Sequence, residues 1–146
     1  MRFREVVRMP LWLLLLIYFF FLSFVVSIWA ALGNNAGLVT LVTVTALLIL
    51  LEIKSSLVIQ VDESELRVGK AHIEYKYIGA TVALTADEMK KVRTRDADPA
   101  AHLDIRFWNP HGVKIHINDS RDATPYWLVT SRKSEELSKL LNSLRN

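Results

Sequence analysis

The sequence contains no cysteine, and this single absence excludes disulfide bonds, thiolate zinc sites and cysteine nucleophiles. It fits a reducing compartment. The chain also lacks any cluster of positive charge: its net charge is +3, and acidic and basic side chains nearly balance across residues 55–146. Nucleic-acid binding needs a concentrated basic patch, so we expect no nucleic-acid partner.

A third absence is the most informative one. Residues 10–51 contain no Asp, Glu, Lys or Arg. A helix over residues 11–32 rises about 1.5 Å per residue and therefore crosses the roughly 30 Å hydrocarbon core of a bilayer. The polar break Gly33-Asn34-Asn35 separates it from a second, shorter apolar run. We predict a transmembrane hairpin with spans at residues 10–32 and 36–52.

The positive charges around this hairpin predict its orientation. Arg2, Arg4 and Arg8 precede the first span, Lys54 follows the second, and the connecting turn has no basic residue. We therefore expect a multi-pass protein of the plasma membrane with both termini in the cytoplasm. A cleaved signal peptide is the rival interpretation, but the first apolar run is too long for one and a second run follows at once.

Small side chains within the spans predict a helix-packing face, because they allow close backbone approach. The two spans could use this face against each other, or two copies of the chain could form a homo-oligomer through it. Neither span holds an ionisable residue, which argues against a transporter or pump. The predicted packing face consists of Ser23, Ser27, Ala31, Gly37 and Thr40.

After Lys54 the apolar pattern changes to a period of two, which is typical of β-strands. Short turns between the strands indicate antiparallel neighbours. Thr85 and Glu88 form a capping box that predicts a short helix over residues 86–92. The expected strands cover residues 57–61, 65–68, 71–77, 80–84, 103–107, 113–117 and 125–130.

The last segment predicts a helix with one apolar stripe that must be covered by the sheet. Ser131 or Ser134 is its expected cap. Seven strands followed by such a helix give the element order of a pleckstrin-homology-like antiparallel barrel with a C-terminal capping helix. We thus expect an N-terminal tail and the two-helix hairpin in residues 1–54, and an α+β, mainly β, cytoplasmic domain in residues 55–146. The stripe consists of Leu137, Leu140, Leu141 and Leu144.

Several short motifs recur in the same order in one known family. The most specific are Asp-Ala-Asp-Pro at residues 96–99 and Thr-Pro-Tyr-Trp-Leu-Val at residues 124–129; Arg-Phe-Trp at residues 106–108 supports them. With the two spans, they make the chain resemble the actinobacterial membrane family termed domain of unknown function 3093. His102 and Ser134 depart from that family's usual Tyr and Pro. The resemblance implies a membrane location and two spans, and it implies no activity.

No residue spacing in the sequence strongly indicates a catalytic or metal-binding site. Three histidines, His72, His111 and His116, could converge on zinc, but no HxH or HExxH spacing supports this, and surface histidines are common on strands. Asp96 and Asp98 begin like a calcium loop but lack its glycine and distant glutamate, so Asp96 is better explained as a turn residue before the following proline. We assign no catalytic, cofactor-binding or metal-binding residue, and expect no enzyme.

The best functional candidates are aromatic and arginine side chains, which dominate binding hot spots. We expect a membrane-anchored interaction module that binds the lipid bilayer and another membrane protein. Two alternatives stay open. The barrel could bind a lipid head group or small ligand through Lys54, Arg67 and Lys70, or, least favoured, the chain could be a metal-dependent hydrolase. The candidate interaction surface consists of Arg106, Trp108, Tyr126, Trp127 and Arg132.

Overall fold

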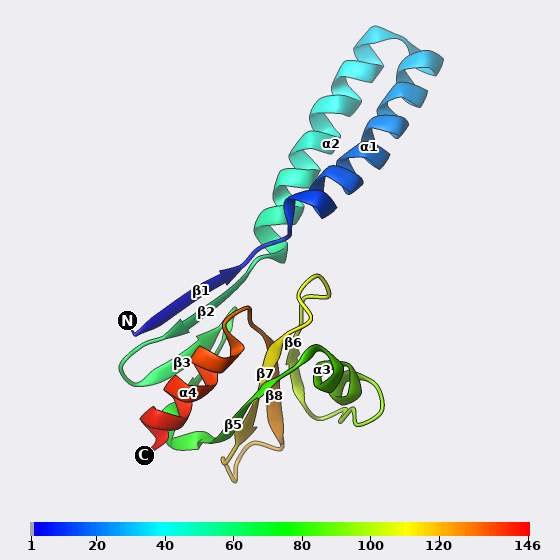
Figure 1. Cartoon of the computed structure of the whole chain (residues 1–146). Helices are drawn as coiled ribbons and strands as arrows, with labels where there is room; N and C mark the ends of the chain where they lie inside the picture. The colour runs from blue at the N-terminus through cyan, green and yellow to red at the C-terminus, as the bar shows by residue number, and fades with distance from the viewer. Residues whose placement is uncertain (1) are drawn as a thin grey trace. The chain divides into compact units, whose positions relative to one another are not determined.

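The computed structural model describes residues 2–146, which form two compact units (Figure 1). One unit, the helical hairpin, is Arg8–Ser56. The other, the strand-rich unit, combines the N-terminal residues up to Val7 with Leu57–Asn146. The predicted boundary after residue 54 lies close to residue 57, where the strand-rich unit resumes. The N-terminal residues up to Val7, predicted to belong with the hairpin, belong to the strand-rich unit.

The hairpin consists of two helices, α1 (Leu11–Leu32) and α2 (Asn34–Ser55). Both are long and apolar enough to cross a membrane, judged by length and composition. Gly33 joins them with a φ of +89°, a region that favours glycine, and its N–H donates to the carbonyl of Trp29 at 3.0 Å. α2 begins two residues earlier and ends three residues later than the predicted span.

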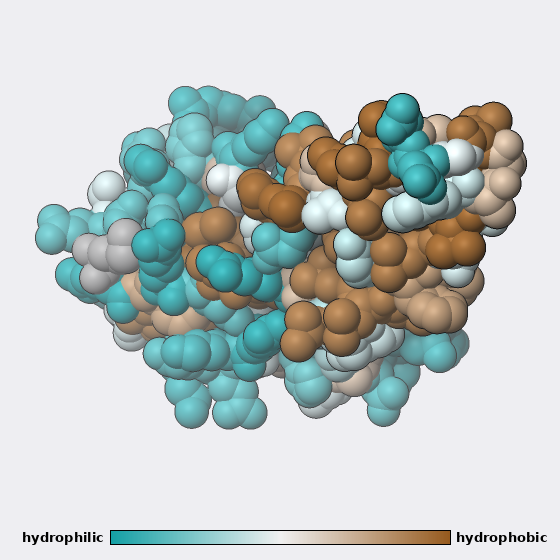
Figure 2. All heavy atoms as spheres, turned by 90° about the horizontal axis from the view of Figure 1, so that it is seen from above, coloured by the Kyte–Doolittle hydropathy of each residue, from teal (hydrophilic) through white to brown (hydrophobic). Residues whose placement is uncertain are grey.

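The two helices pack on each other both near this turn and farther along the hairpin. A Cβ added to Gly37 would lie 2.6 Å from the Trp29 ring, so only glycine allows this approach. The indole N–H of Trp29 donates to Asn34 Oδ1 at 2.7 Å, and the hydroxyls of Tyr18 and Thr45 lie 3.1 Å apart. Many other apolar side chains of the hairpin are exposed, and Figure 2 shows them gathered over it.

The strand-rich unit contains two four-stranded sheets. The first has the order β1 (Phe3–Val7), β2 (Leu57–Val61), β3 (Glu65–Val68) and β4 (Ala71–Glu74). The second has the order β5 (Ile78–Leu84), β7 (Gly112–Ile117), β8 (Tyr126–Thr130) and β6 (His102–Asp104). The 3-10 turn η1 (Tyr75–Tyr77) leads from the first sheet to the second.

Strand β1 comes from the segment before the first span, for which no strand was predicted. It pairs antiparallel with β2 along its whole length, from Phe3 opposite Val61 to Val7 opposite Leu57. Phe3 and Val7 are buried, and the intervening Arg4 is exposed. The alternation is that of a strand with one face in a core. The entire hairpin is therefore inserted between two neighbouring, paired strands.

Two expectations about the sheets need correction. Within residues 2–146 no strand pairing joins the two sheets, so the predicted barrel is not closed. β6 pairs with β8 in parallel, not antiparallel as predicted. The reason is the route of the chain, which passes from β6 through β7, on the other side of β8, before it forms β8. Seven strands lie between residues 57 and 130, as predicted, and β1 adds an eighth.

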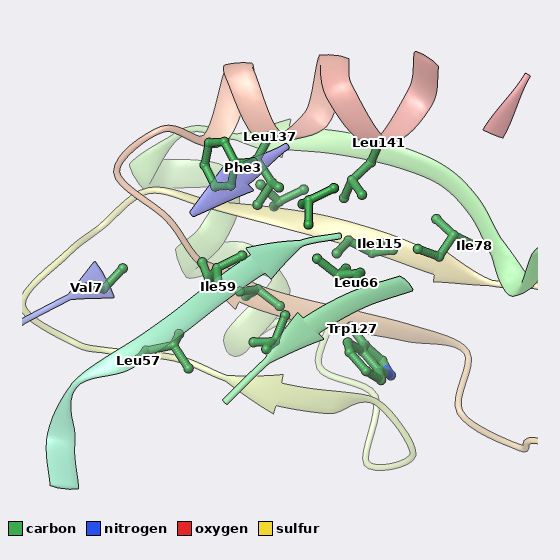
Figure 3. Close-up of a cluster of buried hydrophobic side chains, with 14 residues drawn as sticks. Phe3, Val7, Leu57, Ile59, Leu66, Ile78, Ile115, Trp127, Leu137 and Leu141 are labelled. Carbon is green, nitrogen blue, oxygen red and sulfur yellow. The ribbon is translucent and has the colours of Figure 1, made fainter. Parts of the chain in front are cut away.

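Side chains from both sheets and from the terminal helix α4 (Ser134–Arg145) form the main core (Figure 3). Leu137 and Leu141 are fully buried there, and Leu140 and Leu144 pack at its margin. This confirms that the sheets cover the apolar stripe of the terminal helix. At about 25 cal/mol per Å² of apolar area, such burial is the main stabilising contribution to the fold.

The two helices of this unit differ in how they begin. Helix α3 (Ala86–Arg93) has Thr85 as its N-cap, whose hydroxyl accepts a hydrogen bond from the Glu88 N–H at 3.4 Å, as the capping box predicted. Helix α4 has Lys133 at its N-cap position, with no side-chain capping bond. The prediction of Ser131 or Ser134 as the cap was wrong: the Ser131 hydroxyl accepts from the Lys133 N–H at 3.1 Å, one residue before the helix begins, and Ser134 is already its first residue.

Candidate interaction surface

The two aromatic residues of β8 are both core residues. Tyr126 is 6% exposed and Trp127 is 7% exposed. They lie on opposite faces of the strand and belong to different hydrophobic clusters. Trp127 faces the main core, whereas Tyr126 packs with Leu84, Met89 and Leu128. The second apolar face of β8 is therefore covered by α3.

Beside Tyr126 the second sheet is only partly covered. The Lys114 ammonium lies 4.4 Å from the centroid of the Tyr126 ring, and the His116 ring approaches it edge-on at 6.5 Å. A hollow of about 330 Å³ opens here, lined by apolar, basic and acidic side chains that include Val82, Lys91 and Lys114. Val82, on β5, is 47% exposed. This is an apolar spot within a charged rim.

Arg106 and Trp108 lie together in a tight turn after β6. The N–H of Asn109 donates to the Arg106 carbonyl at 3.1 Å, which makes Phe107 and Trp108 the two central residues of a β-turn. The predicted strand through residue 107 is shorter than expected because of this turn. Phe107 is 70% exposed, and its ring meets the half-buried Trp108 ring edge-on at 5.2 Å. Phe107 was not among the predicted surface residues, although the aromatic pair Phe107-Trp108 before Asn109-Pro110 is a signal that indicates it.

Arg132, the fifth predicted residue, is exposed, and its backbone binds a buried carboxylate. Its N–H donates to Glu5 Oε1 at 2.7 Å, and the Ser131 hydroxyl donates to Glu5 Oε2 at 2.5 Å. Glu5 is 8% exposed on β1. The alternation of Phe3, Glu5 and Val7 could have indicated this inward position.

The turn that contains Phe107 is tied to the same place. The Arg106 N–H donates to the Thr130 hydroxyl at 2.9 Å, and the Ser131 N–H donates to the His111 carbonyl at 3.2 Å. Residues 130–132 thus connect the turn on one side with Glu5 of β1 on the other. The structure brings Arg106, Trp108 and Arg132 to one end of the unit, without Tyr126 and Trp127.

The predicted helix-packing residues divide into two groups. Gly37 is buried and Thr40 half-buried in the hairpin. Ser23, Ser27 and Ala31 are exposed. The hydroxyls of Ser23 and Ser27 donate to carbonyls of their own helix, four residues earlier. Of the five predicted packing residues, the two on α2, Gly37 and Thr40, are therefore the ones that take part in the packing of this hairpin.

Among residues 2–146, no group of three or more His, Cys, Asp or Glu side chains is placed to hold a metal ion. The Asp98 carboxylate accepts from the Ala100 N–H at 2.9 Å, so Asp98 takes the turn role expected for Asp96. The His102 ring lies 3.0 Å from the Asp104 carboxylate and stacks at a tilt on Trp127.

Electrostatic effects are clearest in the loop between β7 and β8. Hydrogen bonds from the side chain and backbone N–H of Arg121 lower the pKa of Asp119 below its usual value. Hydrogen bonds from Thr124 lower the pKa of Asp122. The Arg121 guanidinium also reaches the Tyr77 hydroxyl at 2.5 Å. These contacts order a surface loop.

Along the chain, an apolar helical hairpin is thus inserted between the first strand and the remainder of a two-sheet unit. The chain belongs to the family described as protein of unknown function (DUF3093), whose pattern matches residues 2–141. This confirms the resemblance seen in the sequence motifs. No curated protein and no solved structure matches the chain.

Proposed function

We propose that this chain is an integral membrane protein whose hairpin anchors the strand-rich unit at the inner face of the plasma membrane. The observation that carries the proposal is the pairing of β1 with β2. Val7, the last residue before the hairpin, lies opposite Leu57, the first residue after it. The chain leaves and re-enters the unit at adjacent positions. A hairpin with both ends on one side of the membrane fits this connection, whereas a single crossing does not.

The composition of the hairpin supports the same proposal. Each helix has 22 residues, enough for about 33 Å at 1.5 Å per residue. Large apolar side chains are exposed along both helices, a surface too extensive for a hairpin exposed to water. Arg8 and Lys54 flank the hairpin, and basic flanks favour the cytoplasmic side.

The absence of cysteine permits a direct test. We would introduce single cysteines at Asn35, in the hairpin turn, and at Ser120, in the β7–β8 loop, and add a membrane-impermeant maleimide to intact cells. We expect labelling of the Asn35 variant alone, with Ser120 labelled only after permeabilisation. Labelling of Ser120 in intact cells would refute the orientation, and extraction of the protein by carbonate would refute the anchoring.

We further propose that the strand-rich unit is a non-enzymatic interaction module with another membrane protein as its partner. Anchoring supports this role, because it raises the effective concentration of the unit near membrane partners. The exposed Val82 within a rim of Lys91, Lys114 and His116 has the apolar centre and polar rim of an interface. A pleckstrin-homology-like relationship stays a proposal, supported by two four-stranded sheets and the helix α4.

The partner surface is tested by co-purification in mild detergent. We expect Val82→Asp to lose a membrane protein that co-purifies with the unchanged chain, because it puts charge at the apolar centre. The matched control is Thr85→Ser, nearby and exposed, which keeps the α3 cap. Retention of the same partner by Val82→Asp would reject this surface.

A further inference from the structure

The turn formed by residues 106–109 has an unusual composition for its geometry. Central positions of β-turns are usually occupied by Pro, Asp, Asn, Ser or Gly. Here they are Phe107 and Trp108. Phe107 is 70% exposed, the same exposed fraction as that of apolar side chains in the hairpin such as Leu11 at 71%. Such an exposed aromatic residue lowers its free energy when an apolar phase covers it.

The turn is held rigidly in this position. Asn109 is 8% exposed, and its Oδ1 accepts from the His111 N–H at 3.3 Å. The Arg106 N–H is bound by the Thr130 hydroxyl of β8. Trp108 supports the Phe107 ring edge-on from the inner side of the turn. The aromatic tip is therefore preorganised, and little further ordering is needed when it binds.

The turn also lies at the end of the unit where the chain departs for the hairpin. Residues 130–132 bind it on one side and Glu5 on the other, and Glu5 precedes the last residue of β1 by two positions. In Figure 1 the β6–β7 connection extends toward this end of the strand-rich unit. From Val7 to Leu11 the chain spans at most about 14 Å.

From these observations we propose that the Phe107–Trp108 turn inserts into the interfacial region of the lipid bilayer and gives the strand-rich unit a second membrane contact. This inference rests on the proposed membrane anchoring. Aromatic rings favour the level of the lipid head groups. Arg106 belongs to the turn and Arg132 to the segment that binds it, and their positive charges suit the anionic head groups of the inner leaflet. The contact fixes which face of the unit is turned to the membrane and which remains open to a partner.

The cysteine-free full chain allows the depth of single positions to be measured. We would label single cysteines with bimane in vesicles of phosphatidylcholine and phosphatidylglycerol that carry doxyl-quencher lipids. The label at position 110 reports on the turn with Phe107 intact. Position 120 is the control, because Gly112 pairs with Thr130 and His116 with Tyr126, which puts the β7–β8 loop at the other end of the sheet. Position 20, on α1, reports separately on anchoring.

We expect lipid quenching at position 110 to exceed that at position 120 by about twofold or more, as for an inserted interfacial group. Phe107→Asp should abolish the excess, and Phe107→Leu should keep it. Because Phe107 is exposed, both variants should keep the circular dichroism spectrum of the unchanged chain. Equal quenching at positions 110 and 120, or excess quenching that survives Phe107→Asp, would overturn the inference.

The remaining outcomes separate this inference from the proposed function. Quenching at position 20 without excess at position 110 leaves the anchoring in place and rejects the turn contact. A position 110 label shielded from aqueous iodide but not quenched by lipid means that a second copy covers the turn, and this also rejects it. Loss of quenching at position 20 rejects the anchoring itself.

Discussion

The carboxylate of Glu5 accepts a hydrogen bond from the hydroxyl of Ser131, at 2.5 Å and across 126 residues of sequence. The same carboxylate accepts from the N–H of Arg132. The bond joins the strand that precedes the hairpin to the segment that precedes the last helix. One buried acidic side chain thus links the N-terminal strand of the strand-rich unit to its C-terminal segment.

Glu5→Ala should destabilise this unit by about 1–3 kcal/mol, because the buried Ser131 hydroxyl and the Arg132 N–H both lose their acceptor. Glu5→Gln should cost less, since the amide oxygen can still accept one bond. The measurement is thermal unfolding in detergent, followed by near-ultraviolet circular dichroism. Arg4→Gln, an exposed change on the same strand, is the control and should shift stability by no more than about 0.5 kcal/mol. Equal effects of Glu5→Ala and Arg4→Gln would show that the contact is not stabilising.

The strand-rich unit should fold without the hairpin, provided that β1 is kept. We predict that residues 2–7 joined to residues 57–146 by Asn-Gly form a soluble, cooperatively folding protein, because Asn-Gly is the favoured two-residue connection between paired strands. Residues 57–146 alone should aggregate or unfold, since β2 would become an open edge and the Phe3 and Val7 side chains would leave the core. Analytical ultracentrifugation and denaturant titration compare the two proteins; a stable, monomeric 57–146 fragment would contradict the role of β1.

Gly112→Ala should be among the most damaging small changes in the second sheet. Its Cβ would lie 2.5 Å from the Val129 carbonyl and 2.6 Å from Met89 Cε, so the backbone must move, at a cost of about 1–3 kcal/mol or more. Gly69→Ala is the comparison: its φ of +59° is strained for alanine, but the nearest atom to the new Cβ is 3.6 Å away, and about 1 kcal/mol is expected. Urea unfolding of both variants decides the order of the two effects.

Gly37→Ala should displace the Trp29 ring, because the new Cβ would lie 2.6 Å from it. The hydrogen bond from the Trp29 indole to Asn34 should then weaken. The chain has four tryptophans, so the indole N–H signals are resolvable by nuclear magnetic resonance. The Trp29 signal should shift in Gly37→Ala and in Asn34→Ala, but not in the exposed control Val39→Ala. An unmoved Trp29 signal in Gly37→Ala would show that the helices pack differently.

Arg121→Gln should raise the pKa of Asp119 toward its ordinary value, because the side chain of Arg121 provides the largest effect that lowers it. A lowered pKa in the folded state stabilises the fold at pH values above the unfolded pKa of about 3.9, and this contribution is lost as the pH falls through the folded pKa. The β7–β8 loop of the unchanged chain should therefore loosen only in strong acid. Carboxyl titration by nuclear magnetic resonance measures both pKa values. That of Asp122, lowered by Thr124, should stay low in Arg121→Gln and serves as the control.

The sequence predicted most elements of the chain because their signals are local. The uncharged run predicted both helices of the hairpin, the period-two pattern predicted the strands, and the Thr85–Glu88 capping box predicted α3. The four leucines at the C-terminus set the buried face of α4. Each of these features is decided by residues within a few positions of one another.

The missed features depend on contacts between distant residues. β1 is only five residues long, and its pattern has meaning only when β2, fifty residues later, lies beside it. Tyr126 and Trp127 were expected to contribute to a binding surface, but both are buried. The sequence of β8 alone does not show that α3 covers one of its faces and the main core the other. The parallel pairing of β6 with β8 likewise follows from the order of strands in space.

The insertion of the hairpin between β1 and β2 has a consequence for synthesis of the protein. The first seven residues leave the ribosome early, yet their partner strand follows only after the whole apolar segment has been made. A nascent β1 has no sheet to join during that interval. In the proposed membrane-anchored protein, entry of the hairpin into the bilayer would bring the two strands together and shorten the loop that must close. The strand-rich unit would then complete its fold only on chains already delivered to the membrane, so that delivery itself would act as a checkpoint for folding.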